Sequence, residues 1–226
     1  MKPHLTLDPA RQSWARIRKH IGLVLLTTLV LIPDFLLVEN WRHDLPSFDR
    51  ALCLGLLGGA TSFAYLAILA RFLFGSTIEL RKPIVAAYVA HSTMSGAWWA
   101  FCQQVEMVEA WYFLNVWIIA LEFLALPFAY WRPLVLLGQE TPIPAVRRSL
   151  SEFRKSGLNL VLNQWLVPLL LLLLIAFSMA FDLLPAQYTV PFTFALTAII
   201  VPFQEVVLLV IYQQKFTAQK PEPATN

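Results

Sequence analysis

The chain repeats one seven-residue phrase, as Ser13-Trp-Ala-Arg-Ile-Arg-Lys19, Ser76-Thr-Ile-Glu-Leu-Arg-Lys82 and Ser149-Leu-Ser-Glu-Phe-Arg-Lys155. Each version begins with Ser and ends with a large apolar residue followed by Arg-Lys, a doublet found nowhere else in the sequence. An apolar run of bilayer-crossing length follows each version. The pattern predicts a threefold repeated unit in a polytopic membrane protein.

The composition supports a membrane protein. Of 226 residues, 58% are hydrophobic and only 14% are charged, which leaves too little polar surface to cover a soluble globule. Crossing a hydrocarbon core of about 30 Å takes roughly 18 to 25 apolar residues. We therefore predict an all-α protein with six transmembrane helices, at 21–38, 51–73, 84–105, 110–130, 158–181 and 190–213.

The distribution of basic residues predicts the orientation. With the N-terminus inside, only Arg42 and Arg50 of the 17 Lys and Arg residues fall on the outer side. Short loops rich in Lys and Arg stay in the cytoplasm. We expect a multi-pass protein of the bacterial inner membrane with both termini cytoplasmic and a flexible tail at 214–226.

The repeat predicts the internal organisation of a single integral membrane domain, residues 1–226. Units at about 9–74, 75–130 and 140–213 would each hold two helices, giving three hairpins that enter the membrane in the same direction. A simpler explanation stays open, because positive-inside topology alone places basic residues before every outward-going helix. The shared Ser and the shared apolar residue favour duplication.

The first and third phrases are typical of short amphipathic helices at the headgroup level. Asp8 would cap the first helix with Pro9 at its first position, and Pro144 would start the third. Each has an apolar face at helical spacing, formed by Trp14, Ile17 and Ile21 in the first and by Val146, Leu150 and Phe153 in the third. Basic residues that we expect to meet anionic lipid are Arg18, Lys19, Arg81, Lys82, Arg147, Arg148, Arg154 and Lys155.

A polar layer inside the membrane is the most function-like feature. About nine residues from the cytoplasmic boundary, roughly 12 to 14 Å deep, the six helices offer Thr28, Ser62, His91, Glu122, Gln164 and Glu205. A buried carboxylate is costly and should pair or be neutralised. One hypothesis is a cavity or proton relay formed by Glu122, Glu205 and His91, near helix breaks at Pro127 and Pro202. The alternative is that these groups only hydrogen-bond neighbouring helices and fix their packing.

Two further patterns concern helix contacts. Ala51, Gly55 and Gly59 recur at four-residue spacing, a small-residue stripe that lets another helix approach closely. Cys53 and Cys102 lie near the outer ends of their helices, so a disulfide is one state, while two free buried thiols are the one we favour.

Recognised catalytic and cofactor motifs are absent from the sequence. It contains no Walker loop, no GxGxxG turn and no metal-ligand spacing, so we expect no cofactor and no metal. The segment His91-Ser-Thr-Met-Ser-Gly96 is close to the serine motif of rhomboid proteases but lacks its first glycine. The basic residues belong to topology, which argues against nucleic acid as a partner.

The third unit resembles a known group of proteins. The segments Trp131-Arg-Pro-Leu-Val-Leu-Leu-Gly138, Ala145-Val-Arg-Arg-Ser149 and Pro202-Phe-Gln-Glu-Val-Val-Leu-Leu-Val-Ile-Tyr212 are similar to the YciC-like bacterial inner-membrane families and to the membrane domain of some glycerophosphodiester phosphodiesterases. The resemblance implies a six-helix membrane protein without an assigned catalytic site. It transfers no catalytic residue to this chain.

These observations favour a non-enzymatic accessory or scaffold protein of the inner membrane. Its partners would be membrane lipids, anionic at the cytoplasmic face, and a membrane protein or a second copy of the chain. The alternative is a small transporter or channel that uses His91, Glu122 and Glu205 for proton or cation coupling. An intramembrane enzyme acting on lipid ranks third, because the sequence shows no pairing of a nucleophile with a base.

Overall fold

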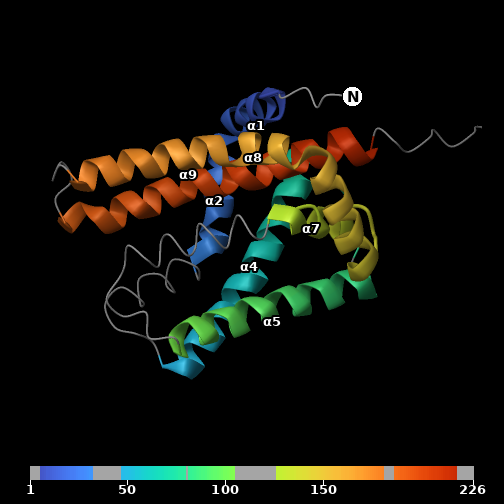
Figure 1. Ribbon diagram of the computed structural model, residues 1–226, viewed down its shortest axis with the longest axis horizontal. Helices are drawn as coiled ribbons and strands as arrows, with labels where there is room; N and C mark the ends of the chain where they lie inside the picture. Colours follow the sequence, from blue (N-terminus) through green and yellow to red (C-terminus); the bar gives the residue numbers. More distant parts are fainter. Residues whose placement is uncertain (1–5, 33–46, 80, 105–125, 181–185, 218–226) are drawn as a thin grey trace, which may run out of the picture. The chain divides into compact units, whose positions relative to one another are not determined.

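The computed structural model describes residues 6–32, 47–79, 81–104, 126–180 and 186–217, and every regular element in these ranges is a helix. This confirms the all-α class. The contacts group into two compact units, of which the first contains residues 1–25 and 152–226 and the second residues 26–151. The α-helices of both units are labelled in Figure 1.

The first unit joins the two ends of the chain. It contains α1 (Asp8–Lys19), the start of α2 (Ile21–Thr28), the later part of α8 (Pro142–Ala180), α9 (Ala186–Tyr212) and the π-helical turn η3 (Gln213–Thr217). The second half of α9 is its core, since all residues of 205–212 are buried. A helix segment buried on every side needs no polar face, which explains why this run is almost entirely apolar.

The second unit is built on a helical hairpin. It contains η1 (Leu29–Leu31), α4 (Phe48–Phe74), α5 (Lys82–Gln104), η2 (Leu126–Phe128), α7 (Trp131–Leu136) and the beginning of α8. Helix α7 contacts both α4 and α5. Four of its six residues, Pro133 to Leu136, are buried. A segment expected in a cytoplasmic connection is therefore largely buried helix.

Local signals set both ends of α4. The Ser47 hydroxyl accepts a hydrogen bond from Arg50 N at the start of the helix. At the other end Gly75 adopts the left-handed conformation (φ 63°) and donates to Arg71 O, while Ser76 N donates to Ala70 O. Glycine takes this conformation without the steric cost that a side chain brings.

Small residues bring α4 and α5 close together. Ala51, Gly55 and Gly59 are all buried. A Cβ atom added to Gly59 would lie 2.7 Å from Ser95 Cβ and 2.8 Å from Ser92 Cα, so no side chain fits at this crossing. Gly96 of α5 likewise faces Leu56 of α4. The backbones can approach this closely only because both positions lack a side chain.

Two of the described helices are long and apolar enough to cross a membrane, Phe48–Phe74 and Ala198–Phe216, and Ile21–Leu31 is a shorter apolar segment. Most of the expected span 110–130 lies outside the described residues, as do residues 33–38 of the first span. A set of six spans therefore stays a prediction. The single domain and its three repeat units also stay predictions.

Several predicted helix boundaries and breaks are wrong. Leu7 occupies the N-cap position of α1 and Asp8 is its first helical residue, and α8 begins at Pro142 instead of Pro144. Near Pro127 the chain forms a 3-10 turn, but α9 continues through Pro202 without a break. A proline removes only one backbone hydrogen bond, and membrane helices tolerate that loss where neighbouring groups compensate.

Candidate functional site

The first and third phrases end in the same local structure. The doublet Arg18-Lys19 closes α1, and the next residue, His20, leaves the helical region with φ −123° and ψ 30°. The doublet Arg154-Lys155 is followed by Ser156, a non-helical residue inside α8 with φ −147° and ψ 21°. Each basic helix thus ends in a break directly after its doublet, and an apolar helical segment follows. We call these two places the elbows at His20 and at Ser156.

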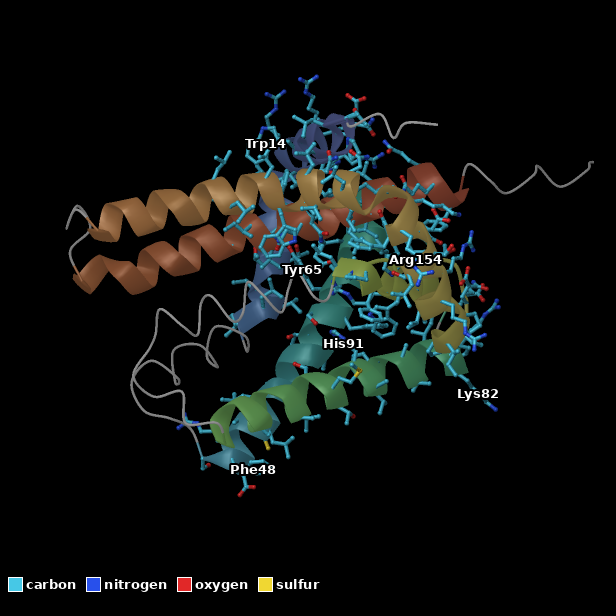
Figure 2. All side chains as sticks on the ribbon, viewed as in Figure 1. Trp14, Phe48, Tyr65, Lys82, His91 and Arg154 are labelled. Atoms are coloured by element: carbon cyan, nitrogen blue, oxygen red, sulfur yellow. The ribbon has the colours of Figure 1, made fainter. Side chains whose placement is uncertain are left out.

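Helix α1 has two opposite faces. Pro9, Ser13 and Ile17 are buried, and α1 packs against α9. The Ser13 hydroxyl donates to Pro9 O at 2.7 Å, so this polar group is satisfied within the buried face. Trp14, which is labelled in Figure 2, is 51% exposed by its accessible surface. Of the three residues expected to form one apolar face, Ile17 is buried, whereas Trp14 and Ile21 are exposed, and Ile21 lies beyond the end of α1.

The outward face of α1 combines an aromatic ring with positive charge. Leu7, Arg11, Trp14 and Arg18 are all exposed and recur at spacings of three and four residues. Residues at these spacings share one side of a helix. Trp14 thus has an arginine about one turn away in each direction, an arrangement suited to the boundary between headgroups and acyl chains.

The beginning of α8 follows a similar design. Ser149 is buried, accepts a hydrogen bond from Tyr130 N at 3.1 Å and donates to Pro127 O at 2.9 Å. These two bonds satisfy backbone groups at the 3-10 turn Leu126–Phe128 and just before α7. The serines of the first and third phrases therefore serve the packing of their helices.

The exposed bases around the elbow at Ser156 differ in their pairing. Arg148 forms an ion pair with Glu140, and Lys155 lies 2.7 Å from Glu152. Arg147 and Arg154 are exposed and make no ion pair with any of the described residues. The hydroxyl of Ser156 donates to Glu152 O and contacts Lys215 Nζ of η3. This polar contact joins the elbow to the end of α9.

The elbow at Ser156 also depends on a glycine. A Cβ atom added to Gly157 would lie 2.9 Å from the ring of Phe153. Phe153 is half-buried, so its ring occupies the space that a side chain at residue 157 would need. The break thus lets an aromatic ring fold back over the following turn.

The second phrase has a different structure. Residues 76–79 follow the end of α4 in a non-helical connection, and Lys82 is the first residue of α5. Arg81 forms an ion pair with Glu79 in this connection, and both side chains are exposed. The second copy therefore shares the basic doublet but has neither the amphipathic helix nor the elbow.

Within the polar layer the structure pairs Ser62 with His91. Ser62 Oγ of α4 lies 2.9 Å from His91 Nε2 of α5, and it also lies 3.1 Å from Gly59 O. The sequence reasoning missed this pair, whose types match a nucleophile and its base. A hydroxyl has only one proton. Donating it to Gly59 O leaves the oxygen to accept from His91 Nε2, so in this arrangement the imidazole is not the base for Ser62.

Two aromatic rings lie near His91. The ring centroids of Phe63 and Trp131 lie 6.0 Å and 5.9 Å from that of His91, and Phe63 and Trp131 lie 6.2 Å apart. Trp131, which directly follows the predicted span 110–130, thus reaches the level of a histidine nine residues along α5 from Lys82. Helix α7 places it there. The sequence signal available was the apolar run of residues 133–137, which is longer than an exposed connection needs.

The remaining members of the layer lie in both units. Thr28 is buried at the end of α2, and Gln164 and Glu205 are buried in α8 and α9 of the first unit. Gln164 Oε1 has no hydrogen-bond partner among the described residues. Glu122 lies outside the described residues. The expected pairing of His91 with Glu122 and Glu205 stays a prediction.

The described residues contain one cysteine side chain and no group of metal ligands. Cys53 is a free, exposed thiol, and the side chain of Cys102 lies outside the described residues. Within the part of the chain that the structure describes, no three His, Cys, Asp or Glu side chains gather in a way that could hold a metal ion.

Comparisons with known proteins identified no relative of the chain. No protein-family model, no curated protein and no solved structure matches the chain. The resemblance to YciC-like families therefore stays a prediction based on the three quoted segments.

Proposed function

We propose that the chain is a non-enzymatic accessory or scaffold protein of the bacterial inner membrane that binds anionic lipid at the cytoplasmic face. It would span the membrane six times with both termini in the cytoplasm, in the manner of the YciC-like families. Its lipid-binding elements would be α1 and the basic part of α8, Pro142–Lys155.

The observation that carries this proposal is the recurrence of a basic helix, an elbow and an apolar helix. At His20 and again at Ser156 the chain leaves helical geometry immediately after Arg-Lys. The break allows a basic helix to lie in the headgroup plane while the next helix enters the hydrocarbon. Exposed Trp14 in α1 and exposed Arg147 and Arg154 in α8 are the side chains expected at such a boundary.

The energetics favour Arg147 and Arg154 as the stronger contributors in α8. A basic residue near an anionic membrane surface contributes about 1 kcal/mol. Arg148 already interacts with Glu140, so neutralising it removes less attraction to lipid. The ion pair of Arg148 thus supports a difference between arginines that the sequence alone treats as equal.

The test compares these arginines in purified protein. Native mass spectrometry in detergent measures binding of phosphatidylglycerol against phosphatidylcholine to Arg147→Gln, Arg154→Gln, the double variant and the matched control Arg148→Gln. We expect about a fivefold loss of phosphatidylglycerol affinity for each single change, about thirtyfold for the double variant, and less than twofold for the control. Unchanged phosphatidylglycerol preference in the double variant would rule out α8 as a lipid-binding element.

A transporter or channel remains the second candidate because of Glu205. This carboxyl group is buried within a helix that is long and apolar enough to span the membrane, and such a residue is a functional-site hypothesis by default. Proton flux into proteoliposomes should then fall with Glu205→Gln and with Glu122→Gln. Equal flux through wild-type protein and empty liposomes would remove this function.

A further inference from the structure

Helix α1 begins without a cap of its own. Leu7 is the N-cap residue, and its side chain makes no capping hydrogen bond. The first backbone N–H groups of a helix have no partner within the helix, and leaving them unpaired in a buried site is costly. Thr6 Oγ1 accepts from Asp8 N, and Pro9 has no N–H group. The N–H group of Ala10 is the one that needs a partner from outside.

That partner is Asn163, a residue far away in the sequence. Asn163 Oδ1 accepts from Ala10 N at 3.0 Å, and Asn163 Nδ2 donates to Thr6 O at 2.7 Å. Neighbouring Asn159 accepts from Thr6 N at 3.3 Å and from Asn163 Nδ2. Asn163 has no exposed surface. The side chain of one helix, α8, therefore caps another helix, α1.

Only a side chain with a donor and an acceptor on one planar group makes both contacts. The amide of asparagine presents an oxygen to Ala10 N and a nitrogen to Thr6 O. A carboxylate offers acceptors only, so it would face Thr6 O with a second oxygen. An aliphatic side chain offers neither group and leaves two backbone groups without partners.

This capping fixes the rotation of α1 about its axis. The capped first turn, the face of Pro9, Ser13 and Ile17 against α9, and a second contact between Gln214 Nε2 and Gln12 Oε1 at 3.2 Å all hold the helix in one orientation. In that orientation the side carrying Trp14 is exposed. A helix held by a single contact would turn freely, whereas α1 is held at its start, along one face and at residue 12.

We propose that the outward face of α1, formed by Leu7, Arg11, Trp14 and Arg18, binds the phosphate groups of anionic phospholipids in the bilayer surface, and that Asn163 is the residue that positions it. The charge complementarity of two arginines beside an interfacial tryptophan identifies the partner as an anionic lipid surface. The inference rests on the lipid-binding function proposed above, and it names the face of α1 that meets the lipid and the residue that orients this face.

The first experiment measures whether Asn163 holds α1 in place. Both native cysteines are first removed by Cys53→Ala and Cys102→Ala. A single cysteine is then placed at Ile17 on the buried face or at Ala15 on the exposed face, and its rate of maleimide labelling is measured in nanodiscs. We expect Asn163→Leu to raise the labelling rate at residue 17 at least tenfold and to leave residue 15 unchanged. Leu158→Ala, at an exposed position on the same helix, is the matched control. Persistent protection of residue 17 in Asn163→Leu overturns the proposal.

A second variant keeps the test decisive if Asn163→Leu does not fold. Asn163→Asp preserves the shape of the side chain, and its carboxyl group can donate to Thr6 O only when protonated. Labelling at residue 17, taken relative to residue 15 at each pH, should therefore be fast at neutral pH and return towards the wild-type rate in acid. A labelling ratio that does not depend on pH in this variant overturns the positioning role.

The lipid readout separates this inference from the proposed function. Arg11→Gln with Arg18→Gln should lower phosphatidylglycerol affinity about thirtyfold in the wild-type background. In the Asn163→Leu background the same two substitutions should lower phosphatidylglycerol affinity by a clearly smaller factor. An α1 that is no longer held in place must first be ordered on binding, and this cost reduces what its arginines contribute to affinity. Equal effects in both backgrounds overturn the inference alone. The α8 part of the proposed function fails independently if the Arg147 and Arg154 variants retain full phosphatidylglycerol preference.

Discussion

Replacing Gly59 by alanine tests the close crossing of α4 and α5. The added Cβ atom would lie 2.7 Å from Ser95 Cβ and 2.8 Å from Ser92 Cα, both below van der Waals separation. Ser92 Cα is backbone, so relief requires the two helices to move apart. Overpacking of this kind costs about 1 to 3 kcal/mol. Alanine regains about 0.5 to 1 kcal/mol of helix propensity, leaving a net destabilisation of about 0.5 to 2 kcal/mol.

Two other glycines give matched comparisons for the same substitution. At Gly96 the nearest atoms belong to the Leu56 side chain, which can rotate away, while Leu52 O at 3.2 Å is a milder contact. At Gly22 nothing lies within 4 Å, so alanine adds helix propensity without a clash. The expected order of stability is Gly59→Ala lowest, then Gly96→Ala, then wild type, with Gly22→Ala highest.

Thermal unfolding of the purified protein in one detergent measures this order. At about 2 to 4 °C per kcal/mol for a chain of this size, Gly59→Ala should lower Tm by about 1 to 8 °C and Gly22→Ala should raise it by about 1 to 4 °C. A Tm for Gly59→Ala at or above that of wild type would refute the close crossing. An equal loss at Gly22 would show that glycine flexibility, and not packing, determines the result.

Three more substitutions test single contacts, each followed by Tm under the same conditions. Ser62→Ala removes the hydroxyl that His91 contacts at 2.9 Å and should cost about 1 to 3 kcal/mol, whereas Ser62→Thr should retain most of the stability. Ser149→Ala leaves Tyr130 N without its acceptor and should cost a similar amount, with a larger loss than the same change at exposed Ser151. Gly75→Ala places a side chain at φ 63° and should cost about 1 to 2 kcal/mol, unless the end of α4 takes another conformation.

Much of the helical framework follows from the sequence because its signals are local. A capping serine, a run of apolar residues and a left-handed glycine determine α4 within the span of the helix itself. The small-residue spacing of Ala51, Gly55 and Gly59 depends only on helix periodicity, and these residues are buried as a set. The depth count along each helix placed Ser62 and His91 at one level, and the structure joins them by a hydrogen bond.

The features that the sequence did not reveal depend on distant parts of the chain. Asn163 caps a helix whose first residue lies more than 150 positions earlier, and no local pattern records that pairing. The burial of α7 depends on the surface offered by α4 and α5. The burial of Ile17, in contrast to exposed Trp14, depends on the packing of α1 against α9.

The three phrases can now be separated into two physical contributions. All three have Arg-Lys beside an apolar helix, and orientation of a membrane protein requires no more than that. Only the first and third add a buried serine and a break directly after the doublet, while the second is a short connection that leads straight into α5. In the predicted topology all three copies have the same orientation, so orientation alone does not account for the buried serine and the break that only the first and third copies have. We infer that the Arg-Lys doublet reflects membrane orientation. The features that favour duplication of a unit are the two elbows, which only the first and third copies share.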